Sequence, residues 1–93
     1  MTNERITSHD IATRLIGFYD RAFGGKPNGR YRISPKNLRR LMQRRRITDD
    51  DKKELANEMF ELGFVFIDLE SFYVITSART FTNYRRLSDS LVG

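Results

Sequence analysis

The chain has 93 residues, no cysteine, one histidine and a formal net charge of +5. Chains of this length form one domain, whereas chains below about 40 residues usually need disulfides or metals. The lack of cysteine excludes disulfides and thiolate metal sites and fits a reducing, cytoplasmic location. The first ten residues contain no apolar run, and apolar stretches such as 64–67 are too short to cross a bilayer. We therefore expect neither a signal peptide nor a membrane segment.

The first helix is predicted over residues 7–23. Thr7 and Asp10 resemble a capping box, in which a threonine and an acidic residue three positions later bind each other's backbone N–H groups. Apolar residues then recur at helical spacing through Leu15 and beyond. A glycine pair followed by proline ends the helix. A flexible loop and a short strand at 31–33 come next.

Two further helices are predicted over residues 34–46 and 48–62. Ser34 is a good N-cap and Pro35 suits the first helical position. Thr48 precedes three aspartates, which the helix dipole favours in the first turn. Only a short turn separates the two helices, as in a helix-turn-helix.

A β-hairpin and a terminal helix complete the predicted elements. Residues 64–76 form two runs rich in aromatic and β-branched residues around a short polar piece, which predicts a hairpin. Residues 80–92 place apolar side chains three or four positions apart, which predicts a helix. The chain is therefore predicted to be a small α+β domain.

This order of elements is similar to that of a known family. The residues that carry the similarity are the Ser34-Pro35 helix start, Leu38, Leu41 and Met42, the Thr48 cap, and the passage Glu61-Leu62-Gly63-Phe64-Val65 into the hairpin. Residues 8–76 resemble the winged-helix family of DNA-binding domains. The resemblance implies a winged-helix-like fold with an added C-terminal helix, and binding of DNA through the third helix and the hairpin.

The sequence departs from that family pattern in its charge. Residues 47–70 contain eight acidic residues and only two lysines. Phosphate neutralisation supplies much of the affinity for DNA, so a surface of this charge opposes binding. The usual contact surface of the family therefore does not carry over to the third helix and the hairpin of this chain.

Basic residues are concentrated in the preceding segment instead. Residues 30–46 contain eight basic residues and no acidic one, and arginine predominates, as suits bidentate contacts to phosphate or guanine. If Leu38 and Met42 face the core, Lys36, Arg40 and Arg44 form one row on the second helix. We expect nucleic-acid binding, with DNA favoured over RNA, through Lys26, Arg30, Arg32, Lys36, Arg39, Arg40, Gln43, Arg44, Arg45 and Arg46.

Other interpretations remain open. Arginines 44–46 stand where a helix C-terminus favours cations, and they can pair with aspartates 49–51 across the turn. The acidic third helix can instead make the chain a protein-interaction adaptor that binds a basic partner, without nucleic acid, through Asp50, Glu54, Glu58 and Glu61. The basic surface of one molecule can also meet the acidic surface of the next.

The terminal helix has two possible roles. Its apolar stripe can fold back on the core of its own chain or pack against the same helix of a second copy. The resemblance favours the second role, a homodimer formed through Phe81, Tyr84, Leu87 and Leu91.

Catalytic residues, metals and cofactors are not predicted. His9 lies beside Asp10 at a helix start, and nothing in the spacing supplies a nucleophile for it. Aspartates 49–51 diverge by about 100° per residue on a helix and cannot all face one ion. The loop at 24–29 lacks the Lys-Ser/Thr ending of a phosphate-binding loop. We expect a small transcriptional regulator or accessory DNA-binding protein, not an enzyme.

Overall fold

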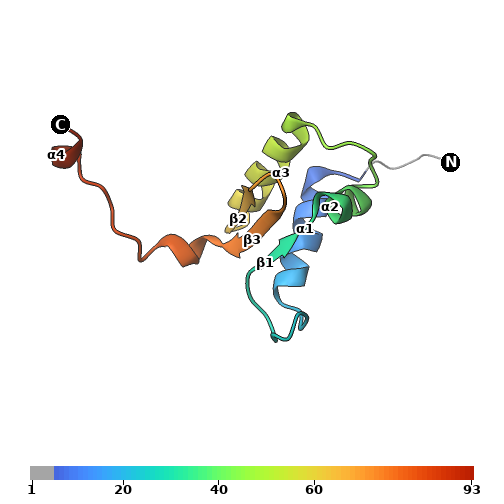
Figure 1. Cartoon of the computed structure of the whole chain (residues 1–93). Coiled ribbons are helices and arrows are strands. Elements are labelled where there is room, and N and C mark those ends of the chain that lie inside the picture. Colours follow the sequence, from blue (N-terminus) through green and yellow to red (C-terminus); the bar gives the residue numbers. More distant parts are fainter. Residues whose placement is uncertain (1–5) are drawn as a thin grey trace.

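The structure, a computed structural model, describes residues 6–93 and has an α+β architecture (Figure 1). Its elements in chain order are α1 (Ser8–Tyr19), β1 (Tyr31–Ile33), α2 (Pro35–Met42), α3 (Asp49–Glu61), β2 (Phe64–Asp68), β3 (Tyr73–Ser77), the 3-10 helix η1 (Ala78–Phe81) and α4 (Asp89–Val92). No helix within residues 6–93 combines the length and apolar character needed to cross a membrane.

The three strands form one antiparallel sheet in the order β1-β3-β2. Ile75 at the centre of β3 lies opposite Tyr31 of β1 on one side and Phe66 of β2 on the other. The short strand β1 therefore extends the hairpin sheet, although α2, α3 and β2 separate it from β3 in the sequence. This pairing also fixes where the loop before β1 lies relative to the hairpin.

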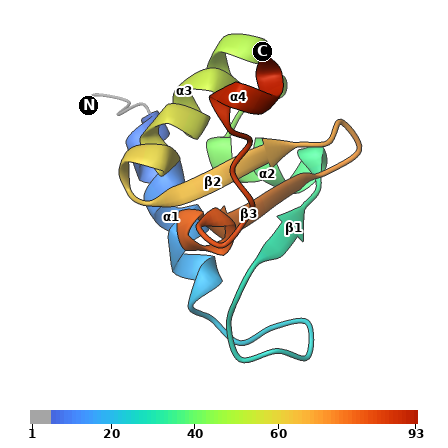
Figure 2. The ribbon, with the colours of Figure 1, turned by 90° about the vertical axis from the view of Figure 1, so that its left-hand side faces the viewer.

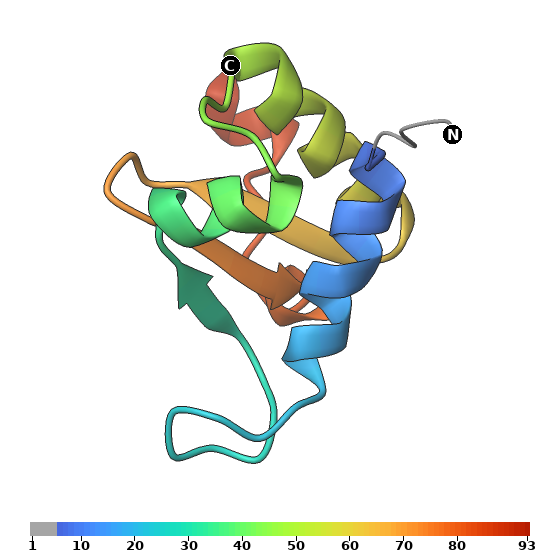
Figure 3. The ribbon, with the colours of Figure 1, turned by 90° about the vertical axis from the view of Figure 1, so that its right-hand side faces the viewer.

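Helices α1 and α2 lie over one face of the sheet, in front of the strands in Figure 3, and Figure 2 shows the opposite face with the C-terminal segment in front of it. The core is apolar and takes side chains from every main element. Its fully buried members include Ile11, Leu15, Leu38, Leu55, Met59 and Ile75. Burial of these side chains is the main driving force for the fold, at about 1.5–3 kcal/mol for each large one.

The predicted starts of the first three helices are confirmed. Thr7 and Asp10 form a capping box at α1, and Thr48 and Asp51 form one at α3. The Ser34 hydroxyl accepts the backbone N–H of Asn37 at 3.1 Å at the start of α2. Each side chain satisfies an N–H group that has no partner within the helix, so the local sequence is sufficient to place these ends.

Two helices end earlier than the sequence predicts. The helix expected over 7–23 ends at Tyr19, because the Tyr19 carbonyl accepts the N–H of Gly29 and the chain then turns back between Phe23 and Lys26. The helix expected over 34–46 ends at Met42, because Gln43 takes a left-handed conformation with φ of 56°. Arginines 44–46 therefore lie beyond α2, and the helical row of Lys36, Arg40 and Arg44 does not form.

The C-terminal segment also differs from the prediction. The helix expected over 80–92 is replaced by η1 and the four-residue α4, joined by irregular chain. Figure 1 shows this segment leaving the sheet and running away from the rest of the domain. A short amphipathic helix depends on packing for its stability, and here Leu87 and Leu91 are 66% and 75% exposed. We call residues 78–93 the C-terminal extension.

Candidate nucleic-acid interface

The predicted basic residues fall into two groups. Lys26, Arg30, Arg32, Lys36, Arg40, Gln43, Arg45 and Arg46 are exposed, whereas Arg39 and Arg44 are half-buried. Within residues 6–93, Arg44 is the one member of the predicted set that forms an ion pair with an acidic side chain. We call the following residues the basic face: Arg30, Arg32, Lys36, Arg39, Arg40, Arg45 and Arg46.

A groove of about 740 Å³ lies beside α2. Its walls come from the end of α1 and the loop after it, from β1, from α2 and from the turn between β2 and β3. Figure 3 shows β1, α2 and this turn close together at the left. Among the described residues that line it, every charged side chain is an arginine: Arg21, Arg32 and Arg40. The groove thus brings together two predicted contact residues, Arg32 and Arg40, from different elements.

Aromatic side chains form much of the groove wall. They are Phe18, Phe23, Tyr31 and Phe72. The Tyr31 hydroxyl donates a hydrogen bond to the backbone oxygen of Leu15 at 2.5 Å, and burial raises the pKa of Tyr31, so its phenol stays neutral. The ring of Tyr31 makes edge contacts with Phe18 and Phe23 at centroid distances of 6.3 and 5.4 Å. Tyr31 therefore fixes the cluster to α1.

Two of the groove arginines lie over aromatic rings. The guanidinium carbon of Arg32 is 5.3 Å from the ring centroid of Phe72, and that of Arg21 is 5.3 Å from the ring centroid of Phe18. Both distances are within the range of a cation–π interaction. These contacts orient the guanidinium groups in the groove while leaving their N–H donors without a carboxylate partner among residues 6–93.

Arg44 does not belong to this interface. Its Nη1 donates a hydrogen bond to Asp51 Oδ1 at 2.5 Å, across the turn between α2 and α3. The N–H of Thr48 also binds the Asp51 carboxylate, and these bonds hold the pKa of Asp51 below its usual value. The predicted pairing of arginines 44–46 with aspartates 49–51 across the turn is therefore confirmed for Arg44. Arg45 and Arg46 form no such pair within residues 6–93.

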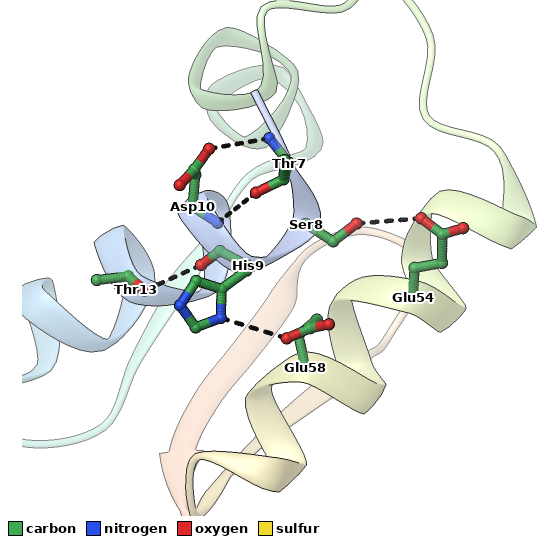
Figure 4. Close-up of polar contacts among 7 residues, drawn as sticks. All are labelled: Thr7, Ser8, His9, Asp10, Thr13, Glu54 and Glu58. Carbon is green, nitrogen blue, oxygen red and sulfur yellow. Dashed lines mark hydrogen bonds and ion pairs between the residues drawn. The ribbon is translucent and has the colours of Figure 1, made fainter. Parts of the chain in front are cut away.

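The acidic side chains of α3 have partners of their own. Ser8 Oγ donates to Glu54 at 3.1 Å, and His9 Nδ1 lies 3.3 Å from Glu58, so both glutamates bind α1 (Figure 4). Of the four residues predicted to dock a basic partner, Glu54 and Glu58 therefore join two helices of the chain itself. Asp50 and Glu61 are exposed and form no ion pair in the described part of the chain.

Lys52 joins α3 to the hairpin. Its Nζ is 2.8 Å from Asp68 at the end of β2 and 3.6 Å from Asp49 on α3. The hydrogen bond with Asp68 raises the pKa of Lys52 and lowers that of Asp68. Lys52 is therefore engaged within the protein, which leaves Lys53 as the unpaired lysine of α3 among residues 6–93.

The residues predicted to form a dimer lie on the C-terminal extension. Phe81 is half-buried and meets Tyr84 edge to face at 5.2 Å, while Tyr84, Leu87 and Leu91 are exposed. Phe60 and Leu62, near the end of α3, are exposed as well. The extension therefore does not fold back on the core of its own chain, which was one of its two predicted roles.

Of the aromatic and charged residues that line the groove, five are not in the predicted contact set: Phe18, Arg21, Phe23, Tyr31 and Phe72. The sequence feature that could have indicated them is an arginine between aromatic residues in 18–23, but the apolar spacing places that segment in the first helix.

In residues 6–93 no three His, Asp or Glu side chains cluster to hold a metal. Comparison with protein-family models, curated proteins and solved structures found no match to this chain.

Proposed function

We propose that the chain is a winged-helix-like domain that binds double-stranded DNA through its basic face and acts as a small transcriptional regulator or accessory DNA-binding protein. One observation carries this proposal: the basic face has no acidic partner within residues 6–93, whereas α3 uses Asp49, Asp51, Glu54 and Glu58 in contacts within the chain. Unpaired guanidinium groups at a surface are available to phosphate oxygens.

The element order and the β1-β3-β2 sheet are compatible with the winged-helix resemblance. The contact surface differs from that of the family, because α3 presents Asp50 and Glu61 to solvent. In the proposed mode α2 and β1 approach the duplex. Lys36 and Arg40, one helical turn apart on α2, neutralise phosphates, and Arg32 approaches from the neighbouring strand. Phosphate contacts of this kind supply affinity and carry no sequence information.

The proposal is tested by fluorescence anisotropy with a labelled blunt duplex over a series of salt concentrations. Release of counterions makes log affinity fall linearly with log salt, with a slope of about −6 if all seven residues of the basic face neutralise phosphates. A steep negative slope supports the proposal. Absence of binding at low salt rules it out and directs attention to a basic protein partner of Asp50 and Glu61.

A further inference from the structure

The groove beside α2 has a composition that phosphate contacts alone do not require. Aromatic rings from α1, the following loop, β1 and the hairpin turn meet there around three arginines. Of these rings, Phe23 is 46% exposed, so a large part of its surface meets solvent. A rod-like duplex with its bases stacked inside offers its phosphates to a protein but no free base face, so it uses the arginines and leaves the rings unoccupied.

We propose that this groove binds an unpaired nucleobase together with its phosphate. Every base has a flat π face, which stacks on aromatic rings and on guanidinium planes. Phe23 and Tyr31 supply the rings, and Arg32 supplies a guanidinium held over Phe72 at 5.3 Å. Arg21 and Arg40 then face the phosphate, and none of the described residues that line the groove is acidic.

Two contacts hold the groove in shape before a ligand arrives. The hydrogen bond from the Tyr31 hydroxyl to Leu15 at 2.5 Å ties the aromatic cluster to the buried side of α1. The backbone bonds between Phe23 and Lys26, at 3.0 Å in both directions, close the turn that carries the Phe23 ring. Binding to groups that are already ordered avoids the entropy of ordering them, which favours affinity.

This inference extends the proposed function, because it adds a site for unpaired bases beside the surface proposed for the duplex. The two share Arg32 and Arg40 but are separable by experiment. The basic face requires phosphates only, whereas the groove requires a base that is free to leave the stack. A base at a strand end and a base of a free nucleotide have the same chemistry, so the source is decided by competition.

The test compares three labelled DNAs by fluorescence anisotropy: a blunt duplex, the same duplex with a four-nucleotide single-stranded tail, and that duplex with an abasic tail. The abasic tail has the same phosphates and lacks the bases. Stacking of one base changes affinity by about fivefold or more. We expect the affinity for the normal tail to exceed the affinity for the abasic tail by about fivefold or more. Equal affinity for the two tails overturns the proposal.

Matched variants locate the effect. Phe23→Ala removes a groove ring, and Phe60→Ala removes a phenylalanine of α3 that is 68% exposed and does not line the groove. The preference for the normal tail should disappear in Phe23→Ala and persist in Phe60→Ala. If circular dichroism shows that Phe23→Ala is unfolded, Arg32→Gln provides the same comparison. A preference that survives both groove variants places the base elsewhere and overturns the proposal.

The result is independent of the proposed function, because the tail alone, as a normal or abasic oligonucleotide, can be titrated without the duplex. A preference for normal bases with no duplex binding supports the groove and rejects the duplex proposal. Duplex binding without any preference for normal bases supports the duplex proposal and rejects the groove as a base-binding site. Where the preference is found, competition with dAMP identifies the source: displacement of the tail shows that a free nucleotide fills the groove, and lack of displacement shows that a strand is required.

Discussion

Arg44 Nη1 and Asp51 Oδ1 lie 2.5 Å apart and join the residues after α2 to the first turn of α3. The side chains are 35% and 13% exposed, so the pair is partly shielded from solvent. Asp51 also binds the N–H of Thr48 at 2.9 Å, so one carboxylate caps α3 and holds the preceding turn. The three consecutive arginines 44–46 are therefore not equivalent, because within the described residues 6–93 the first forms an ion pair and the other two do not.

We predict that Arg44→Gln mainly lowers stability and that Arg45→Gln mainly lowers duplex affinity. Arg44→Gln should lower the free energy of unfolding by about 1 kcal/mol, because it removes the ion pair with Asp51. Arg45→Gln should change stability by less than about 0.5 kcal/mol, because its exposed side chain has no ion-pair partner within residues 6–93. Duplex affinity should fall more in Arg45→Gln. Urea denaturation and anisotropy measure the two quantities, and a larger loss of affinity in Arg44→Gln would contradict this division.

The Asp51 carboxylate should make stability depend on pH in acid. Its pKa lies below the usual value of 3.8, first because the N–H of Thr48 binds it, and also through the Thr48 hydroxyl and Arg44. The unfolded chain therefore binds the proton more readily. The stabilising contribution is complete above pH 3.8 and is lost as the pH falls through the lowered pKa.

The variant Asp51→Asn isolates this contribution. At neutral pH it should unfold more easily than the wild type by about 1 kcal/mol, the usual size of a capping contribution. The difference between the two proteins should shrink as the pH falls below 3.8, because the wild-type carboxylate is then neutralised. Denaturation curves at several pH values measure it, and a difference that stays constant into acid would show that the carboxylate charge is not involved.

The helix starts could be predicted because their chemistry is local. Thr48 and Asp51 are three positions apart, and each satisfies the other's backbone group whatever the rest of the chain does. The two runs of aromatic and β-branched residues likewise predict the hairpin, and Phe66 and Ile75 on its paired strands are buried in the core.

The end of α2 and the groove depend on contacts that the sequence pattern does not contain. No glycine or proline follows Met42 to mark a helix end in the sequence, but the left-handed Gln43 and the bond from Arg44 to Asp51 end the helix there. The groove forms because β1 pairs with β3, which brings Arg32 over Phe72, forty residues later in the chain.

Charge reversal on α2 should weaken duplex binding more than the same change elsewhere. Lys36→Glu with Arg40→Glu places two negative charges on the basic face, so binding should weaken and the salt slope should become shallower by about 2. Arg85→Glu with Arg86→Glu makes the same change in net charge on the C-terminal extension, which Figure 1 shows leaving the domain on the side away from α2. Equal losses in both variants would mean that overall charge, and not the basic face, governs binding.

The C-terminal extension should make the chain a homodimer. Leu87, Leu91 and Val92 are 66–75% exposed on a segment that leaves the domain, and exposed apolar surface of this kind is typical of an interaction site. Leu87→Asp with Leu91→Asp should shift sedimentation from dimer to monomer. Because dimerisation stabilises by mass action, the wild-type unfolding temperature should rise with protein concentration and that of the variant should not. A wild type that sediments as a monomer at every concentration would contradict the dimer. In that case Leu87 and Leu91 would be left as surface for a different partner.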